Sequence, residues 1–290
     1  MSLPTMAKGY ERASTVDWAR AIDAGPFSSI SCGERITFHN PEMMVTMAAA
    51  AAVTERVDVF VNLVVLPLHS PVLIAKQLAT LDNLSAGRLT VGLAVGGREH
   101  DYRAVDAPFA RRHQRLDDGV ATMRRIWAGE PAFDGADTVG PPCVQPNGPR
   151  LLAGAMGPKA LARAAQWADG ISGFTLTSDA GEMQNAAESA RRAWKDAGRA
   201  DAPYIVSGTF YALGVDDSAS TLRGFTHDYL EIFSARFADS VAQQMETSTT
   251  DRLARALDDA EAAGVDEFIL VPASVDRRCL DAAIDFVLAR

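Results

Sequence analysis

Short, almost uninterrupted apolar runs recur along the chain, and stretches with helical character separate them. Runs such as "VDVFVNLVVLP" and "DEFILVP" are typical of strands that are buried on both faces, as in a closed parallel sheet. Alternation of such strands with helices predicts repeated βα units. Eight strands are predicted, at residues 3–6, 27–32, 57–66, 89–95, 151–155, 170–174, 204–213 and 267–271.

The length of the chain agrees with this pattern. A (β/α)8 barrel typically has about 250 residues, and the chain has 290. We therefore expect a single α/β domain over residues 1–290, folded as a (β/α)8 TIM barrel. Two insertions interrupt the rhythm: the Pro- and Gly-rich stretch 130–150 after the fourth helix, and an extended pair of helices that begins at Val215, before the last strand.

Two of the helical segments differ in their apolar patterns. One face of the segment 111–127 carries large apolar side chains spaced four, three and four residues apart, which favours packing against a sheet: Leu116, Val120, Met123 and Trp127. The segment 41–53, "PEMMVTMAAAAAV", starts with Pro41 and is apolar almost all round. We interpret it as a helix buried on both sides, with its outer side in a homodimer interface. An Ala-rich helix with exposed small side chains is the alternative.

Charge and hydropathy argue against nucleic acid and membrane as partners. The net charge of −9 is spread along the chain, so a phosphate backbone would meet general repulsion. The sequence has neither an uncharged apolar run of about 18 residues nor a basic and then apolar segment at its N-terminus. We therefore expect a soluble, cytoplasmic protein.

The cysteines and histidines do not follow the spacing of metal sites. Cys32, Cys143 and Cys279 lie far apart, without a CxxC motif, so free thiols are expected. The five histidines include no HxH or HExxH pattern. No metal site is therefore predicted.

The stretch 79–97, "ATLDNLSAGRLTVGLAVGG", indicates where a ligand binds. Gly87 is well placed for the left-handed conformation that ends a helix and lets the chain reverse into a strand. That strand ends on Gly96 and Gly97, and the carboxyl ends of barrel strands form the active-site face. Glycine at this end lets a ligand approach the backbone, whereas crowding inside the barrel is sufficient to explain Gly92.

A resemblance to a known family is carried by residues 41–129, above all by "VVLPLHSPVLIAKQLATLDNLSAGRLTVGLAVGG" and "DYRAVDAPFARRHQRLDDGVATMRRIW". They resemble the signature region of the luciferase-like flavin and deazaflavin oxidoreductases. That superfamily includes bacterial luciferase, FMN-dependent alkane monooxygenases and enzymes that use coenzyme F420. A second similar patch is "AGAMGPKALARAAQWADG", residues 153–170. The family's fold is a (β/α)8 barrel, in agreement with the strand count. Asp106 stands where many members have glycine.

The resemblance implies that the loop after the fifth predicted strand holds the phosphate of the cofactor. Two glycines free the backbone of this loop, and a proline opens the helix that follows, which is a suitable arrangement for an anion. An ordinary βα turn is the alternative. The residues assigned to this loop are Gly154, Ala155, Met156, Gly157 and Pro158.

Two further cofactor contacts follow from the resemblance. In many members a non-prolyl cis peptide near the end of the third strand forms a bulge behind the central ring of the cofactor. Alignment of "VVLP" places that bond between Asn62 and Leu63, although a plain buried strand is the alternative. In the loop after the fourth strand, the family pattern corresponds to Gly96, Gly97 and Asp101 as contacts for cofactor or substrate. A surface charge cluster is the other interpretation of that loop.

Two side chains are candidates for proton transfer. Glu34 follows the second strand, within "SCGERITFHN", where members of the deazaflavin class often carry an acid. It is the first candidate for a proton donor or acceptor, and a salt bridge with Arg35 is its alternative role. His69, just beyond the third strand, is the second candidate. It could hydrogen-bond the carbonyl edge of the cofactor or cap the following helix.

The resemblance allows three functions. We favour hydride transfer between coenzyme F420 and a small organic substrate, because "GPFSSISCGERI" is similar to deazaflavin-dependent members and the chain has few lysines beside many arginines, as in GC-rich actinobacterial genomes. The first alternative is an FMN-dependent two-component monooxygenase, whose reduced flavin comes from a separate reductase. The second alternative is a barrel that binds flavin or a small ligand without catalysis.

Overall fold

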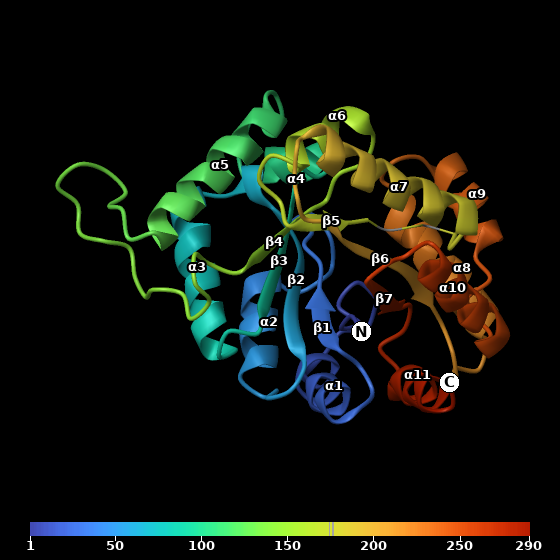
Figure 1. Ribbon diagram of the computed structural model, residues 1–290. Coiled ribbons are helices and arrows are strands. Elements are labelled where there is room, and N and C mark those ends of the chain that lie inside the picture. The colour runs from blue at the N-terminus through green and yellow to red at the C-terminus, as the bar shows by residue number, and fades with distance from the viewer. Residues whose placement is uncertain (174, 176) are drawn as a thin grey trace.

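The computed structural model describes residues 1–173, 175 and 177–290. At its centre is a sheet of seven parallel strands, and each strand pairs with the next one along the chain. Helices surround this nearly closed barrel (Figure 1). Among the described residues no helix is both long and apolar enough to cross a membrane.

The described strands are β1 Ser29–Cys32, β2 Asp58–Val65, β3 Leu89–Ala94, β4 Arg150–Ala153, β5 Gly170–Ser172, β6 Tyr204–Tyr211 and β7 Glu267–Pro272. The helices in the same part of the chain are α1 Arg12–Ala24, α2 Met43–Ala51, the 3-10 helix η1 Leu66–Leu68, α3 Pro71–Leu84, α4 Glu99–Ala104, α5 Arg112–Trp127, α6 Pro158–Ala164, α7 Ala180–Asp196, α8 Ser218–Leu230, α9 Ala235–Gln244, α10 Thr250–Ala262 and α11 Arg277–Leu288.

The segment before α1 lies between the first and last strands and closes the barrel. Ser2 donates its backbone N–H to the carbonyl of Leu270 in β7 (2.9 Å) and forms a single bridge with Ser31 of β1. The strand predicted at residues 3–6 is therefore wrong. Pro4 has no N–H with which to extend a ladder, and the chain turns after it.

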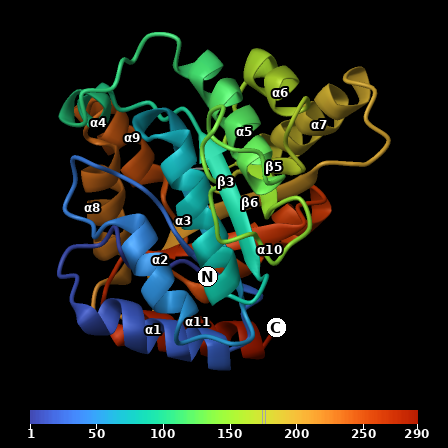
Figure 2. The same cartoon turned by 90° about the vertical axis from the view of Figure 1, so that its left-hand side faces the viewer.

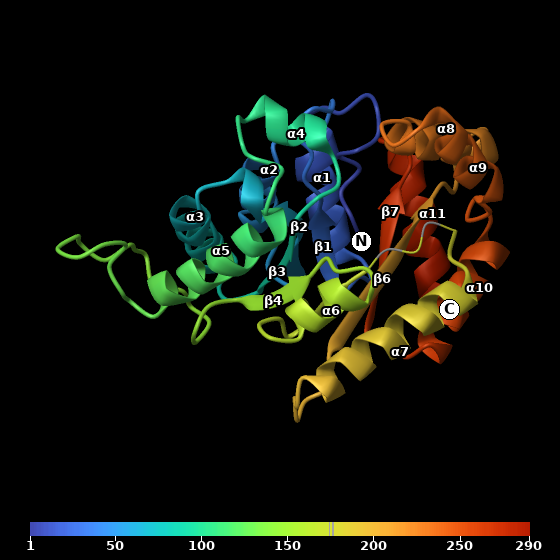
Figure 3. The same cartoon turned by 90° about the horizontal axis from the view of Figure 1, so that it is seen from above.

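The other seven predicted strands are present, with ends that differ by a few residues. The predicted end of the 170–174 strand, Phe174, lies outside the described residues. The predicted pair of helices from Val215 corresponds to α8 and α9, which pack side by side (Figures 1 and 3). Gly87 has the predicted left-handed conformation, with φ of 82°.

Helix α2 is shorter than predicted and presents an apolar outer face. Pro41 does not begin the helix, because the carboxylate of Glu42 accepts a hydrogen bond from the N–H of Val45 (2.6 Å) and caps it. Val45 is 71% exposed, and Leu73 of the neighbouring helix α3 is 54% exposed. Both helices lie on the face that Figure 2 turns toward the viewer.

The insertion 130–149 is the long loop that projects from the barrel in Figure 1, and it contains neither helix nor strand. Its returning half is tied to helix α3 by Asp82, which is fully buried. The carboxylate of Asp82 accepts hydrogen bonds from the N–H groups of Val144 (2.7 Å) and Gln145 (3.0 Å) and from the Gln145 amide (2.8 Å). One buried side chain therefore fixes the path of the loop back into β4.

Replacement of Asp82 by alanine is expected to lower the free energy of unfolding by about 2–4 kcal/mol, because three hydrogen bonds to a buried carboxylate are lost. Urea unfolding followed by circular dichroism measures this change. Asp134→Ala, in the exposed part of the same loop, is the control. Equal stability of the two variants would contradict the role of Asp82.

Candidate active site

Strand β2 is irregular at its carboxyl end, and glycines surround the irregularity. The peptide bond between Asn62 and Leu63 is cis, at the position that the family resemblance implies, and the pairing register with β3 shifts there. A Cβ on Gly92 would lie 2.9 Å from the Cβ of Leu63, and one on Gly154 would lie 2.6 Å from a Leu63 methyl carbon. A Cβ on Gly33 would lie 3.2 Å from the Asn62 carbonyl oxygen. Strand β3 and the residue after β4 therefore need glycine to accommodate this end of β2, and Gly33 after β1 leaves little room for a side chain.

The side chain of Asn62 crosses to strand β5. The hydroxyl of Ser172 donates to the Asn62 side-chain oxygen, at 2.8 Å. The two residues are 110 positions apart, so no local pattern in the sequence indicates this contact. It fixes the orientation of the amide beside the bulge.

Glu34 and His69, the two predicted candidates for proton transfer, lie in contact. The Nε2 atom of His69 is 2.8 Å from Oε1 of Glu34, and Oε2 of Glu34 accepts the backbone N–H of Val65 at 2.7 Å. The Glu34 side chain is 4% exposed and the His69 side chain 25% exposed. A carboxylate held by a strand end therefore orients an imidazole that solvent can reach.

The alternative roles of these two residues do not match the geometry. The guanidinium of Arg35 turns toward helix α8, where Nη2 donates to the carbonyl of Tyr229 (2.8 Å), and Glu34 pairs with His69 instead. Helix α3 is capped by Ser70, whose hydroxyl accepts from Leu73 N–H (3.5 Å), rather than by His69.

The residues 98–102, interpreted from the sequence as part of a loop, belong mostly to the short helix α4. Asp101 in this helix is 4% exposed and joins it to the segment after β1. One oxygen accepts from the N–H of Thr37 (2.8 Å) and from its hydroxyl, and the other accepts from Arg98 (3.2 Å). Burial acts to raise the pKa of Asp101, but the hydrogen bonds from Thr37 and the charge of Arg98 outweigh it and lower the pKa. The geometry makes Asp101 a positioning residue between two loops.

The two glycines after β3 have different surroundings. Gly96 has a φ of 62°, and a Cβ there would lie 2.8 Å from a methyl carbon of Val65. Gly97 faces Phe233, in the connection between α8 and α9. Asp106, where many members of the resembling family have glycine, has a φ of 53°, which is the backbone conformation that glycine adopts most easily.

The predicted phosphate loop borders a cavity of about 620 Å³. Its last glycine, Gly157, has a φ of 78° and precedes Pro158, the first residue of α6. Met156 is 81% exposed. The hydroxyl of Ser207 also lines the cavity, is buried and has no hydrogen-bond partner among the described residues. Most of the cavity lies between helices α6 and α7 and strands β5 and β6, since Leu161, Ala193 and Ile205 also line it. The loop residues 155–158 form one part of its wall.

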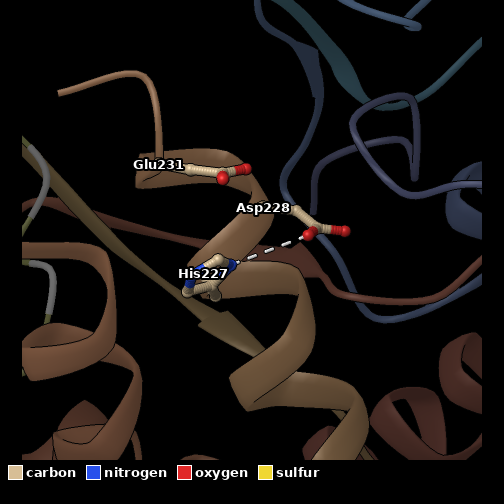
Figure 4. Close-up of side chains that lie close together, drawn as sticks. All are labelled: His227, Asp228 and Glu231. Atoms are coloured by element: carbon tan, nitrogen blue, oxygen red, sulfur yellow. Dashed lines mark ion pairs between the residues drawn. The ribbon is translucent and has the colours of Figure 1, made fainter. Parts of the chain in front are cut away.

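Among the described residues, one group of possible metal ligands is present that the histidine spacing did not indicate. Ligand atoms of His227, Asp228 and Glu231 lie within 4.8 Å of one another at the end of α8 (Figure 4). The ammonium group of Lys8 already pairs with Asp228. All three side chains are partly or fully exposed, and we assign the group to the surface charge of α8.

The comparison with protein families decides the membership of the chain. The family model for luciferase-like monooxygenases matches residues 3–283. The chain belongs to the luciferase-like monooxygenase family. This family of oxidoreductases includes both F420-dependent and FMN-dependent members.

Relatives in sequence match part of this luciferase-like chain. An uncharacterized protein of Mycobacterium tuberculosis is 33% identical over 171 residues, which cover 56% of this chain and 59% of that protein. The pyrimidine monooxygenase RutA of Escherichia coli is 31% identical over 141 residues, or 45% of this chain and 36% of the relative. The chain therefore spans less than two thirds of these relatives.

Solved structures match the whole luciferase-like barrel. The monooxygenase RslO1 from Streptomyces bottropensis has a TM-score of 0.77 at 20% identity, covering 100% of this chain and 98% of that one. An F420-dependent secondary alcohol dehydrogenase, solved with an F420–acetone adduct, has a TM-score of 0.77 at 17% identity, covering 99% and 96%. At these identities the likeness shows the fold alone.

Replacement of Asp101 by asparagine is expected to destabilise the protein at neutral pH but not in acid. Because folding lowers the pKa of Asp101, its stabilising contribution is complete above about pH 5 and is lost as the pH falls below the unfolded value of about 4. Urea unfolding at several pH values should show a deficit of about 1–3 kcal/mol at pH 7 that shrinks below about pH 4. A deficit that does not change with pH would contradict this explanation.

Proposed function

We propose that the protein is an oxidoreductase that holds a flavin-type cofactor at the carboxyl ends of its strands, and that it transfers hydride between coenzyme F420 and a small organic substrate. The observation that carries this proposal is the hydrogen-bonded pair of Glu34 and His69 beside the irregular end of β2. Hydride transfer to or from a carbonyl or alcohol needs a group that moves a proton. The pair supplies such a group at the face where barrel enzymes act.

The residues around the bulge and the cavity would hold the cofactor. When bound, the deazaflavin ring supplies the carbon that accepts or donates the hydride. Leu63 would support the ring from behind, and the backbone of Gly96 and Gly97 would lie along its edge. The loop 154–158, of which residues 155–158 line the cavity, would receive the phosphate-bearing chain. Asp101 would keep the neighbouring loops in place.

Glu34 and His69 have different tasks in this proposal. The Val65 N–H holds one oxygen of Glu34, so the other oxygen stays directed at Nε2 of His69. Glu34 orients the imidazole of His69 and balances its charge when the imidazole is protonated. The side chain of His69 is 25% exposed. In this proposal it reaches the substrate and exchanges a proton with it.

An FMN-dependent monooxygenase is the second candidate, because the relatives include the pyrimidine monooxygenase RutA and the monooxygenase RslO1. A separate reductase would then supply the reduced flavin. The same loop 154–158 would bind the FMN phosphate. A barrel that binds its ligand without catalysis is the third candidate.

Equilibrium binding of F420 and of FMN to the purified protein, measured by fluorescence, separates these candidates. We expect micromolar or tighter binding of F420 and weaker binding of FMN. The reverse preference would favour the monooxygenase. Binding of neither would contradict both, and F420 binding without turnover of small alcohols or ketones would favour the non-catalytic barrel.

Glu34→Gln is expected to retain F420 affinity within about threefold and to lower turnover by roughly a hundredfold or more, the effect typical of a lost general acid or base. Turnover is followed by the absorbance of F420, with small alcohols and ketones as the first substrates. Glu55→Gln, on the exposed surface, is the control. Unchanged turnover in Glu34→Gln would remove the pair from the mechanism.

We also infer a homodimer through the outer face of α2. Val45 and Leu73 leave apolar surface exposed on α2 and α3, and burial of such surface stabilises an interface. Val45→Glu is expected to convert a dimer into a monomer in light scattering. Gln243→Glu, an exposed change on α9, is the comparison that tests for a general effect of charge. A wild-type protein that is monomeric at micromolar concentration would contradict the interface.

A further inference from the structure

A second cavity, of about 600 Å³ and widely open to solvent, lies beside the mouth of the barrel and has a basic lining. It lies between the segment after β1, helix α4 and the connection from α8 to α9. Three of its lining side chains are basic and none is acidic, in a chain whose net charge is −9. The lining residues are Thr37, Arg98, His100, Arg103, Ala104 and Ile232.

The nearby carboxylate of Asp101 is not free to balance this charge. Its oxygens accept hydrogen bonds from Thr37 and from Nε of Arg98. Nη2 of Arg98 donates to the carbonyl of Thr37 (2.9 Å), so Arg98 is fixed in place at the wall. Arg103 is exposed, on the last turn of α4. Its guanidinium group makes no hydrogen bond to the described part of the chain.

The buried guanidinium group of Arg35 lies near this cavity. Arg35 is only 7% exposed, and its Nη1 atom has no hydrogen-bond partner in the described part of the chain. Its guanidinium carbon lies 3.4 Å from the ring centroid of Tyr229 and 4.6 Å from that of Phe38. Arg98 lies 5.8 Å from the same Phe38 ring. Two guanidinium groups thus share one aromatic ring, and a buried charge of this kind is unfavourable unless an anion compensates it.

A short stretch of backbone connects one wall of the cavity with the Glu34–His69 pair. Thr37 follows Glu34 by three residues, so their Cα atoms are separated by roughly 10 Å at most. The phosphate-bearing part of the cofactor is assigned to the loop after β4, on the far side of the loop after β3. The basic cavity therefore remains for the other reactant.

We propose that this basic cavity binds an oxyanion group of the substrate, a carboxylate or a phosphate, and that the protein acts on anionic small molecules. The inference rests on the proposed function for the identity of the reaction, but not for the binding of the anion. Arg103 and Arg98 contact the anion, and Arg35 stabilises it from behind through its charge. The reacting carbon of the substrate then lies toward His69.

Isothermal titration with sodium succinate and with inorganic phosphate, at low ionic strength, tests the cavity directly. We expect saturable binding of at least one of these anions to the wild-type protein, and a loss of roughly tenfold or more in affinity in Arg103→Gln. Arg255→Gln, which removes an exposed arginine of α10, should bind as the wild type does. The stronger of the two anions identifies the carboxylate or the phosphate as the preferred group.

Titration of F420 and FMN into the same variants separates this inference from the proposed function. Unchanged cofactor affinity in Arg103→Gln, together with weakened anion binding, supports a substrate site. Anions that compete with the cofactor, or cofactor affinity that falls with Arg103→Gln, would assign the cavity to the cofactor and overturn the inference. Equal anion affinity in Arg103→Gln and Arg255→Gln, or no saturable binding, would also overturn it. Anion binding that depends on Arg103 in a protein that binds neither cofactor would support the cavity and refute the proposed function.

Discussion

The close packing of the irregular end of β2 against glycines is the constraint on which the site depends. At Gly92 and Gly154 a Cβ would come within 3 Å of the Leu63 side chain, so any side chain there would displace Leu63. The strand end in turn presents the Val65 N–H to Glu34. The position of the imidazole at His69 follows from these contacts, because Glu34 is the partner that orients it.

Each buried charge near the barrel mouth has a different kind of partner. Glu34 is held by a backbone amide and an imidazole, and Asp101 by a threonine and an arginine. Arg35 instead lies against two aromatic rings, and burial lowers its pKa. Ionised groups are expensive to bury without partners. Arg35 is therefore the buried charge with the least complete pairing, whereas the carboxylates are already balanced.

Much of the architecture was predictable because the barrel strands are buried on both faces and appear as unbroken apolar runs. The prediction of a strand at residues 3–6 was wrong because the pairing of this segment depends on two distant strands and stops at Pro4. The position of the cis bond at Asn62 could be placed only by resemblance to a family, since a buried strand without one has the same hydropathy. Helix α4 was missed because its six residues carry charges that are equally typical of a loop.

The candidate site was predictable as separate residues, not as an arrangement. Glu34 and His69 were each identified from their place after a strand, but their contact depends on the register between β1 and β2. Ser172 and Tyr229 were not identified, because they reach the site from 110 and 194 residues away from their partners. Ser207 likewise has no local pattern that marks it, since only the cavity wall shows that its hydroxyl is unpaired.

The most direct test of the account is nitrogen-15 NMR of the protein with labelled histidine, recorded as F420 and then FMN is added. The account predicts that the side-chain signals of His69 move on binding of the preferred cofactor, and that Glu34→Gln alters them beforehand. His227, on the surface of α8, should not respond. A cofactor that binds while the signals of His69 stay unchanged would place the reacting ring elsewhere and contradict the account.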